Sequence, residues 1–168
     1  LVYADKITTV SNTYAYEIQT PQYGEGLDGL LKARCQSLWG IVNGIDVDVY
    51  DPSTDLHIWK NYSLEDTSGK AENKLELQKM FGLPQRDDVP IIGMVTRLVT
   101  HKGLDLVKFV FDSIIAQDIQ VVILGSGEWE FETYFHSQMQ AHHDKVALKL
   151  GFIPDLAHKI YAGADIFL

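Results

Sequence analysis

Residues 89–124 read VPIIGMVTRLVTHKGLDLVKFVFDSIIAQDIQVVIL and carry the clearest indication of the fold. This stretch begins with a short apolar run at 89–96 and ends with a second one at 119–124, and both are typical of buried strands. Between them, residues 103–117 carry apolar side chains at helical spacing, with one face made of Leu104, Val107, Val110, Phe111, Ile114 and Ile115. A strand, an amphipathic helix and a second strand in this order predict a β-α-β unit with parallel strands.

The residues after this stretch repeat the same order. Their pattern predicts a helix at 129–143, a strand at 146–150, a short helix at 156–162 and a fourth, buried strand at 165–168. Apolar strands that alternate with helices imply a parallel sheet with helices on its faces, so the predicted fold class is α/β. With right-handed crossovers, this half of the chain is the first half of a doubly wound, Rossmann-like domain.

The first part of the chain is less regular. A short strand is predicted at 7–10, and Ser11 is a suitable N-cap for a helix at 12–18. Residues 20–31 are rich in glycine and predict a loop. A further apolar run at 39–42 ends at an Asn-Gly turn.

A polar, turn-rich segment at 46–67 has the composition of a connection between domains. It leads into an amphipathic helix predicted at 69–81, which ends at Gly82 and has an apolar side made of Leu77, Met80 and Phe81. We therefore predict three parts: the end of one domain at 1–45, a connection with its helix at 46–88, and half of a second domain at 89–168.

Composition excludes several classes of protein. The 168 residues include 14 Lys and Arg against 23 Asp and Glu, for a formal charge of −9, and 46% are hydrophobic. A chain of this kind forms a core, and it lacks the basic surface of a protein that binds nucleic acid or an anionic membrane. No apolar run is long enough to span a bilayer. The single cysteine, Cys35, excludes an internal disulfide, favours a reducing compartment and is interpreted as a small buried side chain.

The chain starts without Met and stops inside the strand expected at 165–168, so we expect an internal piece of a longer protein.

Ligands of open parallel sheets bind beyond the carboxyl ends of the strands. The first such loop, 97–103, carries Arg97 and Lys102 just before a helix N-terminus, where free N–H groups favour an anion. Arg97 can grip phosphate oxygens with two parallel hydrogen bonds, and Lys102 can act as a point charge. These residues predict a phosphate or diphosphate site, and two cations in a solvated loop are the alternative.

The next two loops carry weaker signals. Gly125 and Gly127 allow either a close approach of backbone to a ligand or a plain tight turn. Phe152, at the end of the strand at 146–150, either stacks on a base or fills the core. No metal site is predicted, because the histidines have no partners at ligand spacing and no cysteine pair exists.

Together these features resemble one family, the bacterial glycogen synthases and plant starch synthases. Four stretches carry the resemblance in order: ADKITTVS at 4–11, YGEGLDGLL at 23–31, GIVNGID at 40–46, and KAENK at 70–74 leading to RLVTHKGLDL at 97–106. The resemblance implies a retaining glucosyltransferase of the GT-B type, with two Rossmann-like domains that face each other across a cleft. The chain would then hold the end of the acceptor-side domain and the first half of the donor-binding domain.

The resemblance also implies roles for individual residues. Arg97 and Lys102 would bind the diphosphate of ADP-glucose and stabilise the charge on the leaving ADP. Asn43 would reach the glucosyl side of the cleft, and the Gly125–Gly127 loop would lie near the nucleotide. Phe152 stands where the family usually has a tyrosine that stacks on adenine, and His101 stands where the family more often has glutamine.

The implied reaction transfers glucose from ADP-glucose to the non-reducing end of an α-1,4-glucan, in the cytoplasm or, in a plant, in a plastid. The implied partners are a nucleotide-sugar donor and an α-glucan acceptor, with no cofactor; the oligomeric state stays open. The family's Lys-Gly-Gly loop and acidic E-x-C-G-L loop lie outside this chain, so we expect no catalysis by the chain alone. Two alternatives remain, namely another GT-B enzyme that uses a UDP-sugar and a non-catalytic module that binds a nucleotide or glucan.

Overall fold

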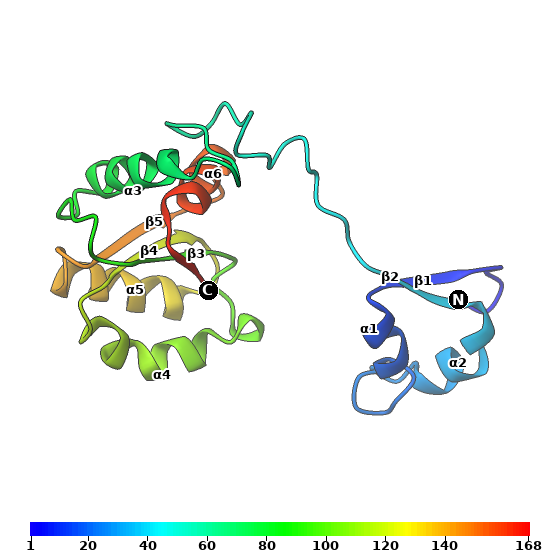
Figure 1. Cartoon of the computed structure of the whole chain (residues 1–168). Coiled ribbons are helices and arrows are strands. Elements are labelled where there is room, and N and C mark those ends of the chain that lie inside the picture. The colour runs from blue at the N-terminus through cyan, green and yellow to red at the C-terminus, as the bar shows by residue number, and fades with distance from the viewer. The chain divides into compact units, whose positions relative to one another are not determined.

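The computed structural model describes all 168 residues and separates into two compact units, Leu1–Asp46 and Val47–Leu168 (Figure 1). The segment at 46–88, predicted as a connection with a helix, belongs almost entirely to the second unit.

The second unit is built on a four-stranded, fully parallel sheet in the order β5-β4-β3-β6. Its strands are β3 (Ile91–Val95), β4 (Gln120–Gly125), β5 (Val146–Leu150) and β6 (Ile166–Phe167). The first strand along the chain, β3, therefore lies inside the sheet, with the second strand on one side and the fourth on the other. The chain adds β4 and β5 on one side of β3 and then crosses to add β6 on the other side. Such a change of side is a topological switch point, where α/β sheets bind ligands.

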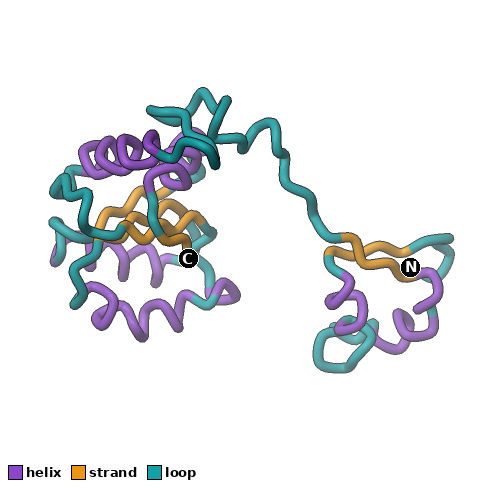
Figure 2. Tube along the Cα trace, viewed as in Figure 1, coloured by secondary structure: helices purple, strands orange, loops and turns teal.

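Helices cover both faces of this sheet, as Figures 1 and 2 show. They are α3 (Ser68–Phe81), α4 (Leu104–Ile115), α5 (Trp129–Ala141) and α6 (Pro154–Gly163). Side chains alternate along β4, so Val121 and Ile123 pack in the core under α4 and α5, whereas Val122 and Leu124 pack in the core under α3 and α6. The predicted α/β fold with a Rossmann-like parallel sheet is confirmed.

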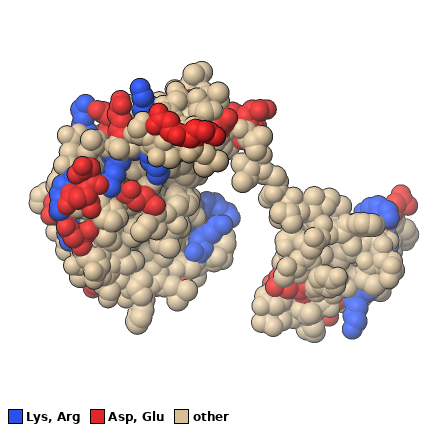
Figure 3. Space-filling view, in the orientation of Figure 1, with Lys and Arg blue, Asp and Glu red and all other residues tan.

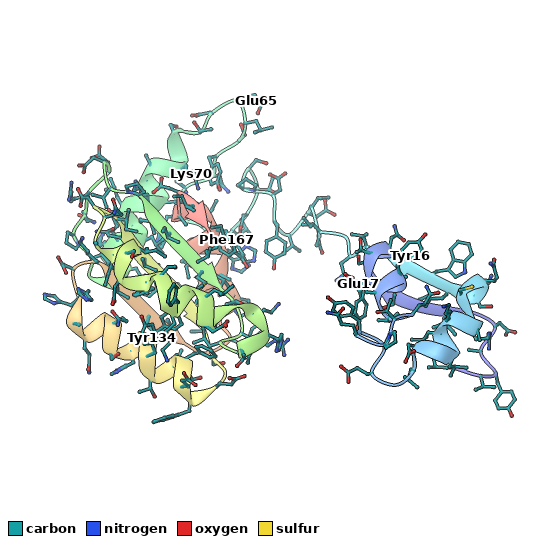
Figure 4. All side chains as sticks on the ribbon, turned by 90° about the horizontal axis from the view of Figure 1, so that it is seen from below. Tyr16, Glu17, Glu65, Lys70, Tyr134 and Phe167 are labelled. Atoms are coloured by element: carbon teal, nitrogen blue, oxygen red, sulfur yellow. The ribbon has the colours of Figure 1, made fainter.

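The face formed by α4 and α5 is largely aromatic. The Phe111 ring of α4 lies 5.6 Å from that of Phe135 and 6.0 Å from that of Tyr134, in edge-to-face geometry. Tyr134, labelled in Figure 4, also donates a hydrogen bond from its hydroxyl to the Lys108 carbonyl (3.3 Å). The face predicted for residues 103–117 is buried or partly buried as expected except at Val110, which is 43% exposed.

The helix at Ser68–Phe81 differs from its prediction, because its buried side is partly polar. Leu77 is fully buried, but Met80 is 54% exposed, so its placement on the apolar side is wrong. Asn73 and Gln78 are fully buried with their hydrogen bonds satisfied: Gln78 donates to Gln120 (2.8 Å), and Asn73 accepts from the Trp59 N–H (3.0 Å). Satisfied amides tolerate burial, so hydrophobic spacing alone misplaced this face.

The segment before α3 is held against α6 by a buried hydrogen bond between two side chains, Asp55 and His158. The Asp55 carboxylate contacts His158 Nδ1 of α6 at 2.6 Å, and both side chains are only 6% exposed. Asp55 also accepts a hydrogen bond from the His57 N–H (2.8 Å), and the Tyr50 ring stacks on the His158 ring at 4.7 Å. Lys70, labelled in Figure 4, donates to the Ala162 and Ala164 carbonyls at the end of α6.

The first unit consists of two parallel strands, β1 (Ile7–Val10) and β2 (Leu38–Ile41), with two short helices, α1 (Asn12–Glu17) and α2 (Asp28–Ala33), and a 3-10 turn, η1 (Cys35–Ser37). The predicted N-cap is confirmed, since the Ser11 side chain accepts from the Tyr14 N–H.

The predicted loop at 20–31 is wrong over its last four residues. There α2 begins at Asp28, an acidic residue that suits a helix N-terminus, and it buries Leu31 against Ile7 and Ile18.

Two burial predictions also fail. The side chains of β6 are about half exposed because β6 lies at the edge of the sheet. Cys35 is an exposed free thiol rather than a buried side chain. None of the helices combines the length and the apolar character that crossing a membrane requires.

Candidate functional site

A cavity of about 220 Å³ opens where β3, β4 and β5 end, at the carboxyl edge of the sheet. Three of the predicted site residues line it: Arg97 after β3, Gly125 at the end of β4, and Phe152 after β5. The sheet geometry explains this meeting, because the carboxyl ends of parallel strands lie at the same edge. A larger cavity of about 810 Å³ lies beside edge strand β5, but it contains none of the predicted residues.

The loop after β3 presents its two cations to solvent. Arg97 and Lys102 are both exposed, and no Asp or Glu side chain forms an ion pair with either of them. The Arg97 guanidinium lies 3.2 Å from His101 Nε2. Figure 3 shows a patch of Lys and Arg on the second unit, over the loop between β3 and α4. In an acidic chain, cations without carboxylate partners favour an anionic ligand.

A short 3-10 helix, η2 (Thr100–Lys102), and Gly103 shape this loop. Gly103 has φ 74°, a left-handed conformation that glycine adopts without strain, and it lets the chain turn directly into α4. Lys102 therefore lies two residues before the first residue of a 12-residue helix, and it is not among the residues that line the 220 Å³ cavity.

The glycines at the end of β4 and just after it are required by close packing of backbone. A Cβ on Gly125 would overlap the Thr96 carbonyl oxygen, and one on Gly127 would overlap the Leu98 carbonyl oxygen. Both glycines therefore let the loop after β4 lie directly against the loop after β3. The Gly127 N–H is already taken by a hydrogen bond to the Glu132 carboxylate (2.8 Å), and Gly127 does not line the cavity.

Replacement of Gly125 by alanine is expected to lower the free energy of unfolding by about 1–3 kcal/mol, because the new methyl group would push the Thr96 carbonyl away. Chemical denaturation of the chain measures this change. Ser126→Ala, between the two glycines, is the matched control and is expected to stay within about 0.5 kcal/mol of wild type. A Gly125→Ala variant as stable as Ser126→Ala would contradict the close packing of the two loops.

Phe152 is not a core residue, since 93% of its side chain is exposed. It follows Gly151, whose φ of 127° is accessible to glycine, and it comes just before Pro154 at the first turn of α6. The ring is thus left free at the rim of the cavity, where it can stack on a flat ligand.

Asn43 lies in the first unit, in an exposed stretch without regular structure at 42–46. The arrangement of the two units therefore decides what it can reach, and its role stays a prediction.

Two residues of this edge escaped the sequence analysis. Glu128 precedes α5, and its carboxylate accepts hydrogen bonds from the backbone N–H of Thr100 (3.2 Å) and from the Thr100 hydroxyl (2.8 Å). The position of Glu128 directly after Gly125-Ser126-Gly127 could have marked it as a site residue. Its partner Thr100 could not be predicted, because it lies 28 residues away in the sequence. No group of three or more His, Cys, Asp or Glu side chains is arranged to hold a metal ion.

Comparisons with known proteins assign the family. Residues 77–168, more than half of the chain, match the family model for glycosyl transferases group 1. The chain belongs to the group 1 glycosyltransferases. Residues 1–33 match the model for the starch synthase catalytic domain. The resemblance to glycogen and starch synthases is thereby confirmed.

Curated relatives agree along the whole chain. The glycogen synthase of Desulforamulus reducens is 54% identical over 99% of this chain, and that of Anoxybacillus flavithermus is 54% identical over all of it. The chain spans 35% of the length of each of these relatives.

Solved structures agree with the fold. The catalytic domain of starch synthase IV from Arabidopsis thaliana, bound to ADP and acarbose, superposes with a TM-score of 0.91 at 36% identity. That match covers 98% of this chain and 34% of the starch synthase chain, and it confirms the predicted GT-B fold class. Anabaena HepE in complex with UDP has a TM-score of 0.58 at 15% identity, which shows the fold alone.

Proposed function

We propose that this chain contributes the diphosphate and base contacts of an enzyme that transfers glucose from ADP-glucose to the non-reducing end of an α-1,4-glucan, with retention of configuration. The observation that carries the proposal is the cavity at the ends of β3, β4 and β5, where Arg97 and Phe152 meet beside the switch point of the sheet. A guanidinium and a free aromatic ring on one small cavity match the two halves of a nucleoside diphosphate.

The chemistry needs these cations. The bond between glucose C1 and the β-phosphate oxygen breaks, the oxygen keeps the electron pair, and a hydroxyl of the glucan forms the new bond to C1 and releases its proton. Negative charge therefore grows on the departing ADP. Arg97 and Lys102, which have no carboxylate partners, would neutralise that charge as it develops. No cofactor is needed for this step.

The adenine base is the proposed ligand of Phe152. The exposed ring lies at the rim of the cavity, and the structurally similar starch synthase IV binds ADP. Asn43 is proposed to act on the glucosyl side, with the glycine loop at 125–127 near the nucleotide. The proposed partners are the nucleotide sugar and the glucan, and the proposed compartment is the cytoplasm.

A chimera tests this proposal. This chain replaces the matching residues of the Desulforamulus reducens glycogen synthase, and glucan synthesis is measured with ADP-glucose and with UDP-glucose. We expect transfer from ADP-glucose with a kcat/KM at least about tenfold above that for UDP-glucose, and a product that α-amylase digests. A folded chimera that prefers UDP-glucose, or that transfers nothing and does not bind ADP, would overturn the proposal.

A further inference from the structure

The two loops at the carboxyl edge of the second unit are joined by one carboxylate. Glu128 Oε1 accepts from the Thr100 N–H at 3.2 Å, and Oε2 accepts from the Thr100 hydroxyl at 2.8 Å. Thr100 is the first residue of η2, and Lys102 is the last. The carboxylate thus takes the first N–H of the turn that carries the cation, and a hydrogen bond to a charged acceptor is stronger than one between neutral groups.

Backbone contacts strengthen the same junction. The Glu128 N–H donates to the Leu98 carbonyl (2.7 Å), and the Leu98 N–H donates to the Ser126 carbonyl (3.0 Å). Leu98 and Gly127 form a parallel bridge beyond the named strands. The loop after β3 is therefore held at Leu98 by backbone hydrogen bonds and at Thr100 by the Glu128 side chain. These contacts limit the movement of η2, the turn that ends at Lys102.

The charge of Glu128 works against an anionic ligand at this loop. A carboxylate beside Thr100 repels a diphosphate, so electrostatics alone would make its removal favourable for nucleotide binding. A positioning role predicts the opposite sign, because loss of the two hydrogen bonds would free η2 and displace Lys102. The direction of the effect therefore separates the two explanations.

We infer that Glu128 is a positioning residue, which acts through Thr100 to hold η2 so that Lys102 reaches the diphosphate. This role rests on the proposed function, since it requires that Lys102 contacts the donor. Glu128 is not among the residues that line the 220 Å³ cavity, so the role needs no contact between Glu128 and the donor.

The test uses three variants of the chimeric synthase. Glu128→Ala is expected to lower kcat/KM for ADP-glucose about ten- to a hundredfold and to weaken ADP binding, which isothermal titration measures. Glu128→Gln keeps an acceptor for the Thr100 N–H and a donor to the Thr100 oxygen, so it is expected to stay within about threefold of wild type. Glu130→Ala removes the same charge two residues further along α5, where the carboxylate contacts Lys108 at 2.7 Å, and is expected to be neutral.

A double-mutant cycle decides whether the effect passes through Lys102. In a Lys102→Ala background, Glu128→Ala is expected to cost no more than about a further twofold in ADP affinity, because the displaced cation is already gone. Thr100→Val removes only the hydroxyl contact, so it keeps the inference testable should Glu128→Ala fail to fold. It is expected to lie between wild type and Glu128→Ala.

Each outcome is decisive. Tighter ADP binding by Glu128→Ala, equal losses in Glu128→Ala and Glu128→Gln, or a full loss in the Lys102→Ala background would each overturn the positioning role. If the wild-type chimera is active and Glu128→Ala matches it, only this role is contradicted. If the folded wild-type chimera neither binds ADP nor transfers glucose, the proposed function falls and this role falls with it.

Discussion

Replacement of Arg97 by alanine is expected to lower kcat for glucosyl transfer by about a hundred- to a thousandfold in the chimeric synthase. The guanidinium lies on the cavity at the strand ends and has no carboxylate partner, so it is free to stabilise the charge that appears on the leaving diphosphate. A group that acts in the transition state changes kcat more than KM. Initial rates over a range of ADP-glucose concentrations separate the two constants.

Matched variants distinguish shape from charge at this position. Arg97→Lys keeps the positive charge but loses the two-pronged geometry, so its kcat is expected to lie between those of wild type and Arg97→Ala. Lys79→Ala removes an exposed cation of α3 that pairs with Glu76 and is expected to leave both constants unchanged. An Arg97→Ala variant within threefold of wild type in kcat and KM would exclude Arg97 from the reaction.

Replacement of Asp55 by alanine is expected to lower the free energy of unfolding by about 2–4 kcal/mol, because two hydrogen-bond donors lose their acceptor. The change leaves His158, which is 6% exposed, without its hydrogen-bond partner, and it removes the acceptor of the His57 N–H. Urea denaturation of the chain measures the loss. Trp39 and Trp129 are exposed and Trp59 is half-buried beside this segment, so a variant with Trp59 alone reports on it by fluorescence.

The acid dependence of this pair has a defined sign. Burial by itself raises the pKa of the Asp55 carboxyl, but hydrogen bonds from His57 and His158 and the charges of both histidines together lower this pKa below its ordinary value of 3.8. A lowered pKa in the folded state adds stability that is complete above about pH 5 and is lost as the pH falls through the folded pKa. The difference in the free energy of unfolding between wild type and Asp55→Ala is therefore expected to become smaller below pH 3.8.

A control lies in the same cluster. Asp155 contacts His57 Nδ1 at 3.3 Å, but its side chain is 69% exposed. Water screens such a pair, so Asp155→Ala is expected to cost at most about 1 kcal/mol. Equal losses for Asp55→Ala and Asp155→Ala would show that burial does not strengthen the Asp55–His158 pair.

Periodicity along the chain was enough to predict the alternating strands and helices from 89 to 168. Each strand there is a short apolar run and each helix has a local pattern, so neighbouring residues carry the signal. The site loop with Arg97 and Lys102 was also predictable, because loops at the carboxyl ends of parallel strands meet at one edge whatever the packing details. The helix α2 was missed altogether, because the proline and glycines at 21–29 indicated a loop and Gly29 lies inside the helix.

Local sequence patterns were thus enough to predict the α/β class, the candidate loops and the residue types available for a diphosphate. The packing of distant segments, which local patterns do not reveal, brings Asp55 to His158, 103 residues away, and Glu128 to Thr100. The same packing requires glycine at Gly125 and Gly127, leaves the Phe152 ring exposed and makes the buried side of α3 partly polar. The physical reason is that backbone preferences act between neighbouring residues, whereas burial and charge pairing depend on which distant segments the folded chain brings together.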